Sequence, residues 1–146
     1  MLDHQLLQAT LSKGGLGLRS AEKHAPCAYT ASLSASADIM EGVIGKAIDM
    51  EMMVDGLPEL ISALAGEEEL TPAAALASSQ KILSHSIDMH SAKLLQDMMV
   101  EEREKVRLNS LSMPRAGDWL NTVPVRALGL HLRPKEFSVA VKYRLG

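Results

Sequence analysis

The sequence predicts a mainly α-helical protein, an irregular helical bundle with a short extended segment near its C-terminus. Apolar residues recur at helical spacing over most of the chain. Residues that favour helix starts and helix ends separate these stretches. Only four of the 146 residues are aromatic, whereas Ala, Leu, Ile and nine methionines supply the candidate core. Side chains of these types suit close helix packing but specify shape weakly, because Met is pliable.

The N-terminal third of the chain predicts two helices and a turn. Four leucines within residues 2–11 lie near helical spacing and predict a short helix there. Gly14 and Gly15 allow positive φ, so we expect the helix to end in a turn at these residues. Ser20 then has the character of an N-cap.

Pro26 and Asp38 complicate the helix that follows Ser20. Pro26 lies too deep for a first turn that begins at residue 21. Either the helix bends there, or a short turn over 20–24 precedes a second start with Pro26 at its first position. Asp38 is a plausible second cap, opening a helix through Ile48.

The middle of the chain alternates breaks and helices. The stretch Asp55–Pro58 predicts a break, residues 59–65 a short helix, and residues 66–69 an exposed loop. Thr71 and Pro72 form an N-cap followed by proline at the first helical position. The longest helical pattern then runs from about residue 71 to 111, with a break expected near Val100.

The tail differs in character. Residues 127–132, "ALGLHL", are short and apolar, and they predict a strand or an extended segment. A last helix is expected to start at residues 133–135.

The cysteine count and the hydropathy pattern exclude several classes of protein. A single cysteine, Cys27, rules out a disulfide framework and a four-cysteine metal site within these residues. No apolar run approaches the length of about 18 residues that a membrane span needs. Residues 1–4 lack the character of a signal peptide. We therefore expect an intracellular protein without membrane contact, and leave nuclear and cytoplasmic locations open.

Charge is distributed unevenly along the chain, whose net charge is −3. Residues 38–70 hold nine acidic residues and one base, Lys46. Residues 114–146 hold six Lys or Arg and two acidic residues. In one interpretation, the charged residues simply lie on the surface in contact with water. In the other, the basic tail meets an anion while the acidic middle faces away from it.

No arrangement of residues predicts catalysis or metal binding within the chain. The glycines at 14–17 lack the G-x-G-x-x-G and G-K-[ST] patterns, so a structural turn is the better interpretation. His85 and His90 are five residues apart and fall on different faces of a helix. Burial of Cys27 in an apolar helix would raise its pKa and mute the thiol. We predict no catalytic residue and no metal ligand.

Nucleic-acid binding is the chemistry that fits the tail best. Trp119, Phe137 and Tyr143 interleave with its bases, as on a surface that follows phosphates. A basic helix that is simply exposed to water is the alternative. The bases are Arg115, Arg126, Arg133, Lys135, Lys142 and Arg144.

Three segments together resemble one family. They are "GGLGLRSAEKHAPCAYTASL" (14–33), "SSQKILSHSIDMHSAKLL" (78–95) and "PRAGDWLNTVPVRALGLHLRPKEFSVAVKYRLG" (114–146). Their order and spacing resemble the region after the fingers and palm in reverse transcriptases of non-LTR retrotransposons, and the last segment is the specific one. The resemblance implies a fragment of a larger protein, with a helical thumb-like region over 1–113 and a basic connector over 114–146 that leads toward a zinc motif.

The resemblance also implies a function. The chain would help an RNA-directed DNA polymerase to bind its template and primer, without catalysis of its own. It lacks the family's catalytic aspartate motif and the C-x-x-C of the zinc motif, so the Mg²⁺ of the parent enzyme and the zinc have no ligands here. The implied partners are RNA or an RNA–DNA hybrid, bound weakly, and the rest of the polymerase. The implied contacts to nucleic acid are Arg19, Lys23, Arg126, Arg133, Lys135, Lys142 and Arg144.

Two other functions fit the same sequence. The missing catalytic and zinc segments are compatible with an inactive retroelement relic. The faces rich in alanine and methionine are compatible with a helical protein-interaction module.

Overall fold

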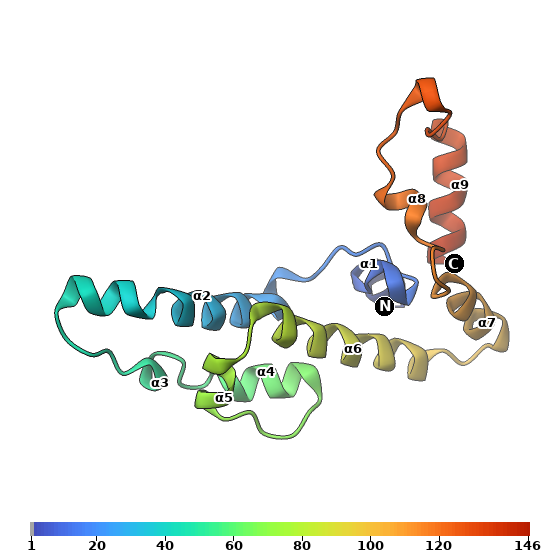
Figure 1. The fold of residues 1–146 in the computed structure, drawn as a ribbon. Coiled ribbons are helices and arrows are strands. Elements are labelled where there is room, and N and C mark those ends of the chain that lie inside the picture. The colour runs from blue at the N-terminus through green and yellow to red at the C-terminus, as the bar shows by residue number, and fades with distance from the viewer. Residues whose placement is uncertain (1) are drawn as a thin grey trace. The chain divides into compact units, whose positions relative to one another are not determined.

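A computed structural model describes residues 2–146 and divides the chain into two units. Unit 1 comprises Met1–Arg19 and Ser91–Gly146, and unit 2 comprises Ser20–His90. The boundary falls inside one helix, α6 (Gln80–Met98). The described residues form nine α-helices and two 3₁₀ turns (Figure 1). The prediction of a mainly α-helical fold is therefore confirmed, whereas the predicted division into residues 1–113 and 114–146 stays a prediction.

Unit 2 begins with α2 (Ala21–Ile44), a helix of 24 residues. Ser20 caps it as predicted, because its hydroxyl accepts a hydrogen bond from the backbone N–H of Lys23 at 3.4 Å. Pro26 lies inside this continuous helix, so the interpretation as a second start is wrong. A proline there leaves only the carbonyl of Glu22 without its helical donor, and Glu22 is exposed to water.

The second helix start predicted at Asp38 is also wrong. Asp38 is an exposed residue in the interior of α2, which ends at Gly45 with φ of 74°. A capping residue favours a helix start only where no helix is already in progress. Extending a helix by one residue costs much less than nucleating a new one.

Four further elements complete unit 2. Two of them are capped by side chains: Asp49 accepts from the Met52 N–H at 3.0 Å, and Thr71, as predicted, from the Ala74 N–H at 3.3 Å. A break at Ser78, whose ψ of 139° is extended, divides the long helix predicted over 71–111. The break expected near Val100 is confirmed. The elements are α3 (Met50–Met53), α4 (Leu57–Ala65), α5 (Pro72–Ala77) and the first half of α6.

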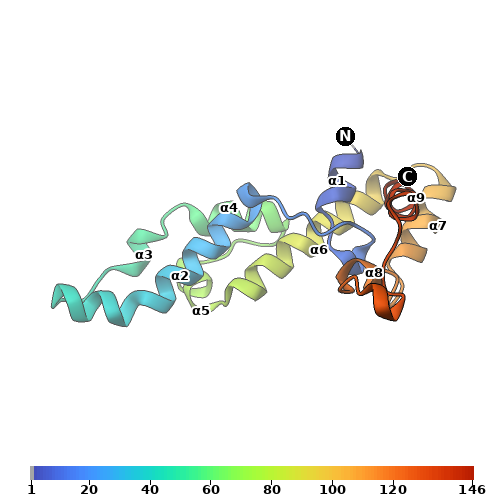
Figure 2. The same cartoon turned by 90° about the horizontal axis from the view of Figure 1, so that it is seen from above.

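In unit 2, α2 lies alongside α4 and α5 (Figure 2), and the core cluster combines side chains of α2, α4 and the first half of α6. Ser34 of α2 donates a hydrogen bond to the carbonyl of Leu76 at 2.9 Å, which joins α2 to α5. Burial of aliphatic side chains supplies most of the stability of such a cluster. The buried cluster comprises Cys27, Ile61, Ala65, Leu83 and Ile87.

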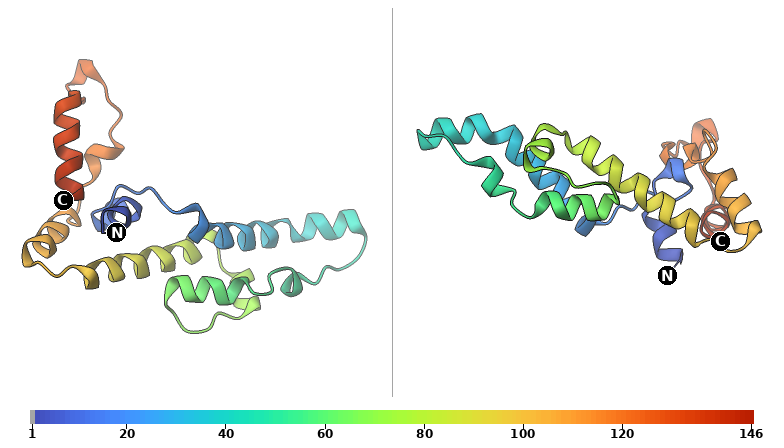
Figure 3. Two further views of the ribbon diagram at one scale, coloured as in Figure 1. Left: turned by 180° about the vertical axis from the view of Figure 1, so that it is seen from behind. Right: turned by 90° about the horizontal axis from the view of Figure 1, so that it is seen from below.

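Unit 1 gathers both ends of the chain. Its N-terminal helix α1 (Leu2–Gln8) is shorter than predicted and is followed by a 3₁₀ turn, η1 (Leu11–Lys13), which Gly14 closes with φ of 84°. Figure 3 shows α1 near the C-terminal end of α9 (Pro134–Leu145). The core cluster here comprises Leu6, Ala9, Leu95, Met99 and Leu108, and Leu145 packs against it.

The C-terminal part of unit 1 holds α7 (Glu102–Leu111), α8 (Asp118–Asn121), a second 3₁₀ turn η2 (Arg126–Leu128) and α9. The segment 127–132 is extended only from Leu130 onward, because η2 and Gly129 turn the chain back on itself. Val125 and Leu130 pair across this turn as an isolated antiparallel bridge. The helix predicted to start at residues 133–135 is confirmed.

In the part of the chain that the structure describes, no helix combines the length and the apolar character that a membrane crossing needs.

Candidate nucleic-acid interface

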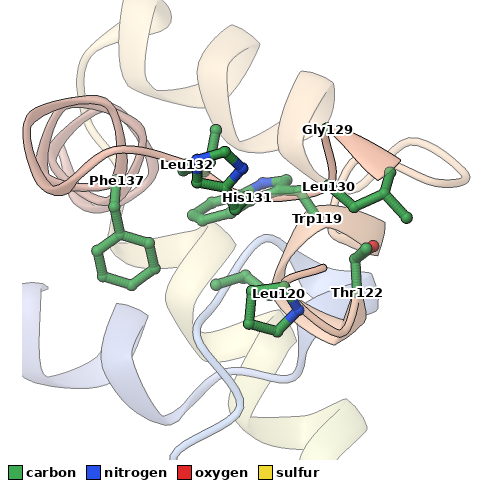
Figure 4. A pocket seen from close by; sticks show the side chains of 9 residues that line it. Trp119, Leu120, Thr122, Gly129, Leu130, His131, Leu132 and Phe137 are labelled. Carbon is green, nitrogen blue, oxygen red and sulfur yellow. The ribbon is translucent and has the colours of Figure 1, made fainter. Parts of the chain in front are cut away.

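An apolar cavity of about 500 Å³ lies between α8, the turn around η2 and the first turn of α9 (Figure 4). We call it the aromatic cleft. Its volume falls in the range of sites that bind small molecules. Apolar side chains form most of its wall. The lining residues are Trp119, Leu120, Thr122, Pro124, Gly129, Leu130, His131, Leu132 and Phe137.

Two aromatic rings shape the cleft. The centroids of Trp119 and Phe137 lie 5.9 Å apart, and their planes cross at 76°. This edge-to-face arrangement is a favourable one for aromatic pairs. Phe137 nevertheless remains 50% exposed, and Leu130 and Leu132 remain almost equally exposed. The cleft therefore offers ring faces and aliphatic surface to a ligand.

Short-range hydrogen bonds hold the walls of the cleft in place. Thr122 donates its hydroxyl hydrogen to the carbonyl of Asp118 at 2.8 Å and closes α8. Val125 and Leu130 exchange two backbone hydrogen bonds of 3.2 and 3.1 Å. Gly129 makes the turn between them with φ of 68°, a conformation that disfavours other residues. These contacts bring Trp119 and Phe137 together although 18 positions separate them in sequence.

Several of the predicted basic residues are exposed and lie close in sequence to the residues that line the cleft. Arg126 belongs to η2, and Lys135 and Lys142 belong to α9. Arg133 is exposed too but pairs with Glu136, its Nε lying 2.8 Å from a carboxylate oxygen. This pairing raises the pKa of Arg133 and lowers the pKa of Glu136. Arg133 is thus partly neutralised within the chain.

Arg144, also predicted to contact nucleic acid, lies inside unit 1 with only 1% of its surface exposed. Its guanidinium donates hydrogen bonds to the carbonyls of Leu11 at 2.6 Å, Gly15 at 2.7 Å and Ala116 at 3.4 Å. Desolvation lowers the pKa of Arg144. Since its donors are used internally, we do not include Arg144 in the interface.

The remaining two predicted residues belong to different units. Arg19 is an exposed residue of unit 1, and Lys23 is a half-buried residue of the first turn of α2 in unit 2. The tail residues of unit 1 are therefore the ones from which an interface can be built.

Two features of unit 1 were missed by sequence reasoning. The aromatic cleft was hidden because residues 127–132 were interpreted as an extended segment. A turn could have been predicted from Pro124 and Gly129, which lie between the two aromatic residues in the sequence. The role of Arg107 has no such signal: it donates from Nη1 to the carbonyls of Tyr143 and Arg144 at 3.1 and 3.2 Å, at the end of α9.

Unit 2 contains a polar cluster that does not form a reactive site. Burial raises the pKa of the Cys27 thiol, as predicted, and Ser84 lies in hydrogen-bond contact with it. His24 and Asp88 approach each other at 3.3 Å between Nε2 and a carboxylate oxygen. A thiol that stays protonated in a dry core is a weak nucleophile. The cluster is best explained as polar packing between α2 and α6.

Among the residues that the structure describes, no three side chains of His, Cys, Asp or Glu converge as a metal site requires.

Comparison of the chain with known proteins finds no matching family model, no matching curated protein and no matching solved structure.

Proposed function

We propose that the chain is a non-catalytic, nucleic-acid-binding segment of a retroelement RNA-directed DNA polymerase, its thumb and connector region. The resemblance of residues 114–146 supports the assignment to that parent enzyme. The observation that carries the binding function is the exposure of three cationic side chains in that same segment, Arg126, Lys135 and Lys142. The role is to hold the template and primer, as RNA or an RNA–DNA hybrid, near the rest of the polymerase.

The chemistry of such a surface is phosphate binding by charge. Lys and Arg side chains neutralise phosphates and release counterions, without reading the base sequence. Three cations contribute a slope of about −3 to the dependence of log affinity on log salt concentration. Binding is therefore weak and falls steeply as salt is raised.

Fluorescence anisotropy with a labelled RNA–DNA hybrid tests this proposal at several salt concentrations. The double variant R126Q/K135Q is expected to reduce the slope by about 2. A matched control, K46Q/K81Q, removes two charges from exposed lysines of unit 2 and is expected to leave the slope unchanged. Absence of binding at low salt, or equal losses in both variants, contradicts the proposal.

A protein-interaction role is the second candidate, and a specific observation favours it. The C-terminal half of α2 exposes Ile39, Val43 and Ile44, with 82% of Val43 accessible. A solvent-facing aliphatic stripe of this kind is typical of a surface that another helix covers. If self-association through this stripe is the function, light scattering shows oligomers that Val43→Asp dissociates.

A further inference from the structure

We propose that the aromatic cleft binds an unpaired nucleobase, stacked on the half-exposed ring of Phe137 beside Trp119, so that unit 1 prefers single-stranded nucleic acid. This inference rests on the proposed function, because it names the form of nucleic acid that the basic segment takes. It adds a contact with a base to a surface so far described by charge alone.

The cleft has the lining and the size for a base. Its volume of about 500 Å³ leaves room for a base and its sugar, and apolar side chains cover most of the wall. Stacking on an aromatic side chain contributes about 1–3 kcal/mol per base and tolerates any sequence, since every base has a π-face. Thr122 and His131 supply the polar groups of the lining.

The surrounding charge favours a nucleic acid as the occupant. Four Lys or Arg of segment 114–146 remain exposed when buried Arg144 and Arg133, which pairs with Glu136, are left out, and Asp118 is the one other acidic residue of the segment. Arg126 lies on the turn that forms one side of the cleft, and Lys135 lies two residues before Phe137. Both are exposed, so they can meet the phosphates on either side of a bound base.

The geometry favours a single strand over a duplex. Bases inside a duplex are stacked on their neighbours and paired, and their faces cannot enter a cleft. Strand ends, loops and overhangs present unstacked bases, which aromatic side chains bind. A duplex thus engages only the cations, whereas a single strand engages the cations and the rings.

Trp119 is the only tryptophan of the chain and lines the cleft, so its emission reports on occupancy. The wild-type protein is titrated with four labelled ligands of equal length: single-stranded RNA, single-stranded DNA, fully abasic DNA and a blunt duplex. Anisotropy measures binding and Trp119 emission measures stacking. We expect quenching by both single strands alone, and about tenfold tighter binding to them than to the abasic strand.

Two variants connect this effect to the cleft. Phe137→Leu keeps an apolar side chain but removes a ring, and it is expected to weaken single-strand binding about tenfold while leaving abasic binding unchanged. Tyr29→Leu is the matched control, because Tyr29 is as exposed as Phe137 but belongs to unit 2, outside the lining. The comparison of wild-type ligands stays decisive if a variant fails to fold.

The outcomes separate this inference from the proposed function. Equal affinity for normal and abasic single strands overturns the base site and leaves phosphate binding in place. Absence of binding to every strand at low salt overturns both. A blue shift of Trp119 emission with N-acetyl-leucine amide, without quenching by any strand, assigns the cleft to an apolar protein segment and also overturns the inference.

Discussion

At the scale of single residues, Arg144 does more to organise unit 1 than any other charged side chain described. A buried cation is costly unless its hydrogen-bonding capacity is satisfied. Here three carbonyls from two distant segments accept from one guanidinium, because its planar fork presents donors in several directions. The residue joins the end of α9 to the turn that contains η1 and to the loop before α8.

Replacement of Arg144 by methionine is expected to lower the free energy of unfolding by about 2–4 kcal/mol. The substitution keeps the bulk of the side chain but leaves buried carbonyls without donors. Arg144→Lys is expected to restore little, since an ammonium cannot reach three carbonyls in this geometry. Urea denaturation measures the change. Lys142→Met, an exposed position on the same helix, is the control, and equal stability of both variants contradicts the prediction.

Two glycines are expected to respond to alanine in opposite ways. A Cβ at Gly15 would lie 2.0 Å from the carbonyl oxygen of Ala9, whereas a Cβ at Gly42, inside α2, meets nothing within 4 Å. Gly15→Ala is therefore expected to destabilise unit 1 by about 1–3 kcal/mol. Gly42→Ala is expected to raise stability by about 0.5–1 kcal/mol, because alanine is the better helix former. Thermal melting that ranks the two variants in reverse order would refute the argument.

At the scale of elements, the start of α9 depends on the pair Arg133 and Glu136. The carboxylate of Glu136 accepts from the Arg133 backbone N–H at 2.8 Å and from its side chain. These two contacts, both donated by Arg133, close the first turn of a helix that begins with proline. They also fix the wall of the aromatic cleft that Phe137 provides.

The pH dependence of α9 follows from the same pair. The side-chain and backbone hydrogen bonds of Arg133 lower the pKa of Glu136. A depressed folded-state pKa contributes stability above the unfolded-state pKa, and this contribution is lost as pH falls through the folded-state pKa. An NMR titration of the Glu136 carboxyl carbon is expected to give a midpoint below the ordinary glutamate range. In Arg133→Ala the midpoint is expected to rise; an unchanged midpoint would show that the side-chain contact is unimportant.

Elements with local signals were predictable from the sequence, and those fixed by distant contacts were not. Ser20 and Thr71 cap their helices through residues three positions away, so a short window of sequence contains the cause. The break at Ser78 was missed because the apolar pattern continues across it. Arg144 was assigned to nucleic acid because its carbonyl partners lie up to 133 positions away. The aromatic cleft was missed for a related reason. The contact between Trp119 and Phe137 depends on the turn around η2, and this turn was not predicted.

At the scale of the whole molecule, the two units have separate cores and separate natural probes. Cys27, the only cysteine, is buried in unit 2, and Trp119, the only tryptophan, lies in unit 1. The raised pKa and full burial of Cys27 predict a thiol that reacts only when unit 2 opens. Each probe thus reports on one unit.

Arg144→Met is expected to shift the unfolding transition of Trp119 emission more than the transition of Cys27 reactivity. The lost hydrogen bonds all lie in unit 1, and the core of unit 2 retains its contacts. Denaturant titrations followed by both probes, with a thiol reagent for Cys27, measure the two midpoints. Equal shifts would mean that the chain unfolds as one cooperative block.

The hydrogen bond between Arg144 and Gly15 also has a consequence for biosynthesis. The two residues are 129 positions apart, and a ribosome that adds about 5–20 residues per second makes the second roughly 6 to 26 s after the first. Unit 2 is contiguous in sequence and lies wholly between them. We therefore expect unit 2 to fold first in the nascent chain. The glycine-rich turn stays accessible to chaperones until Arg144 has been translated.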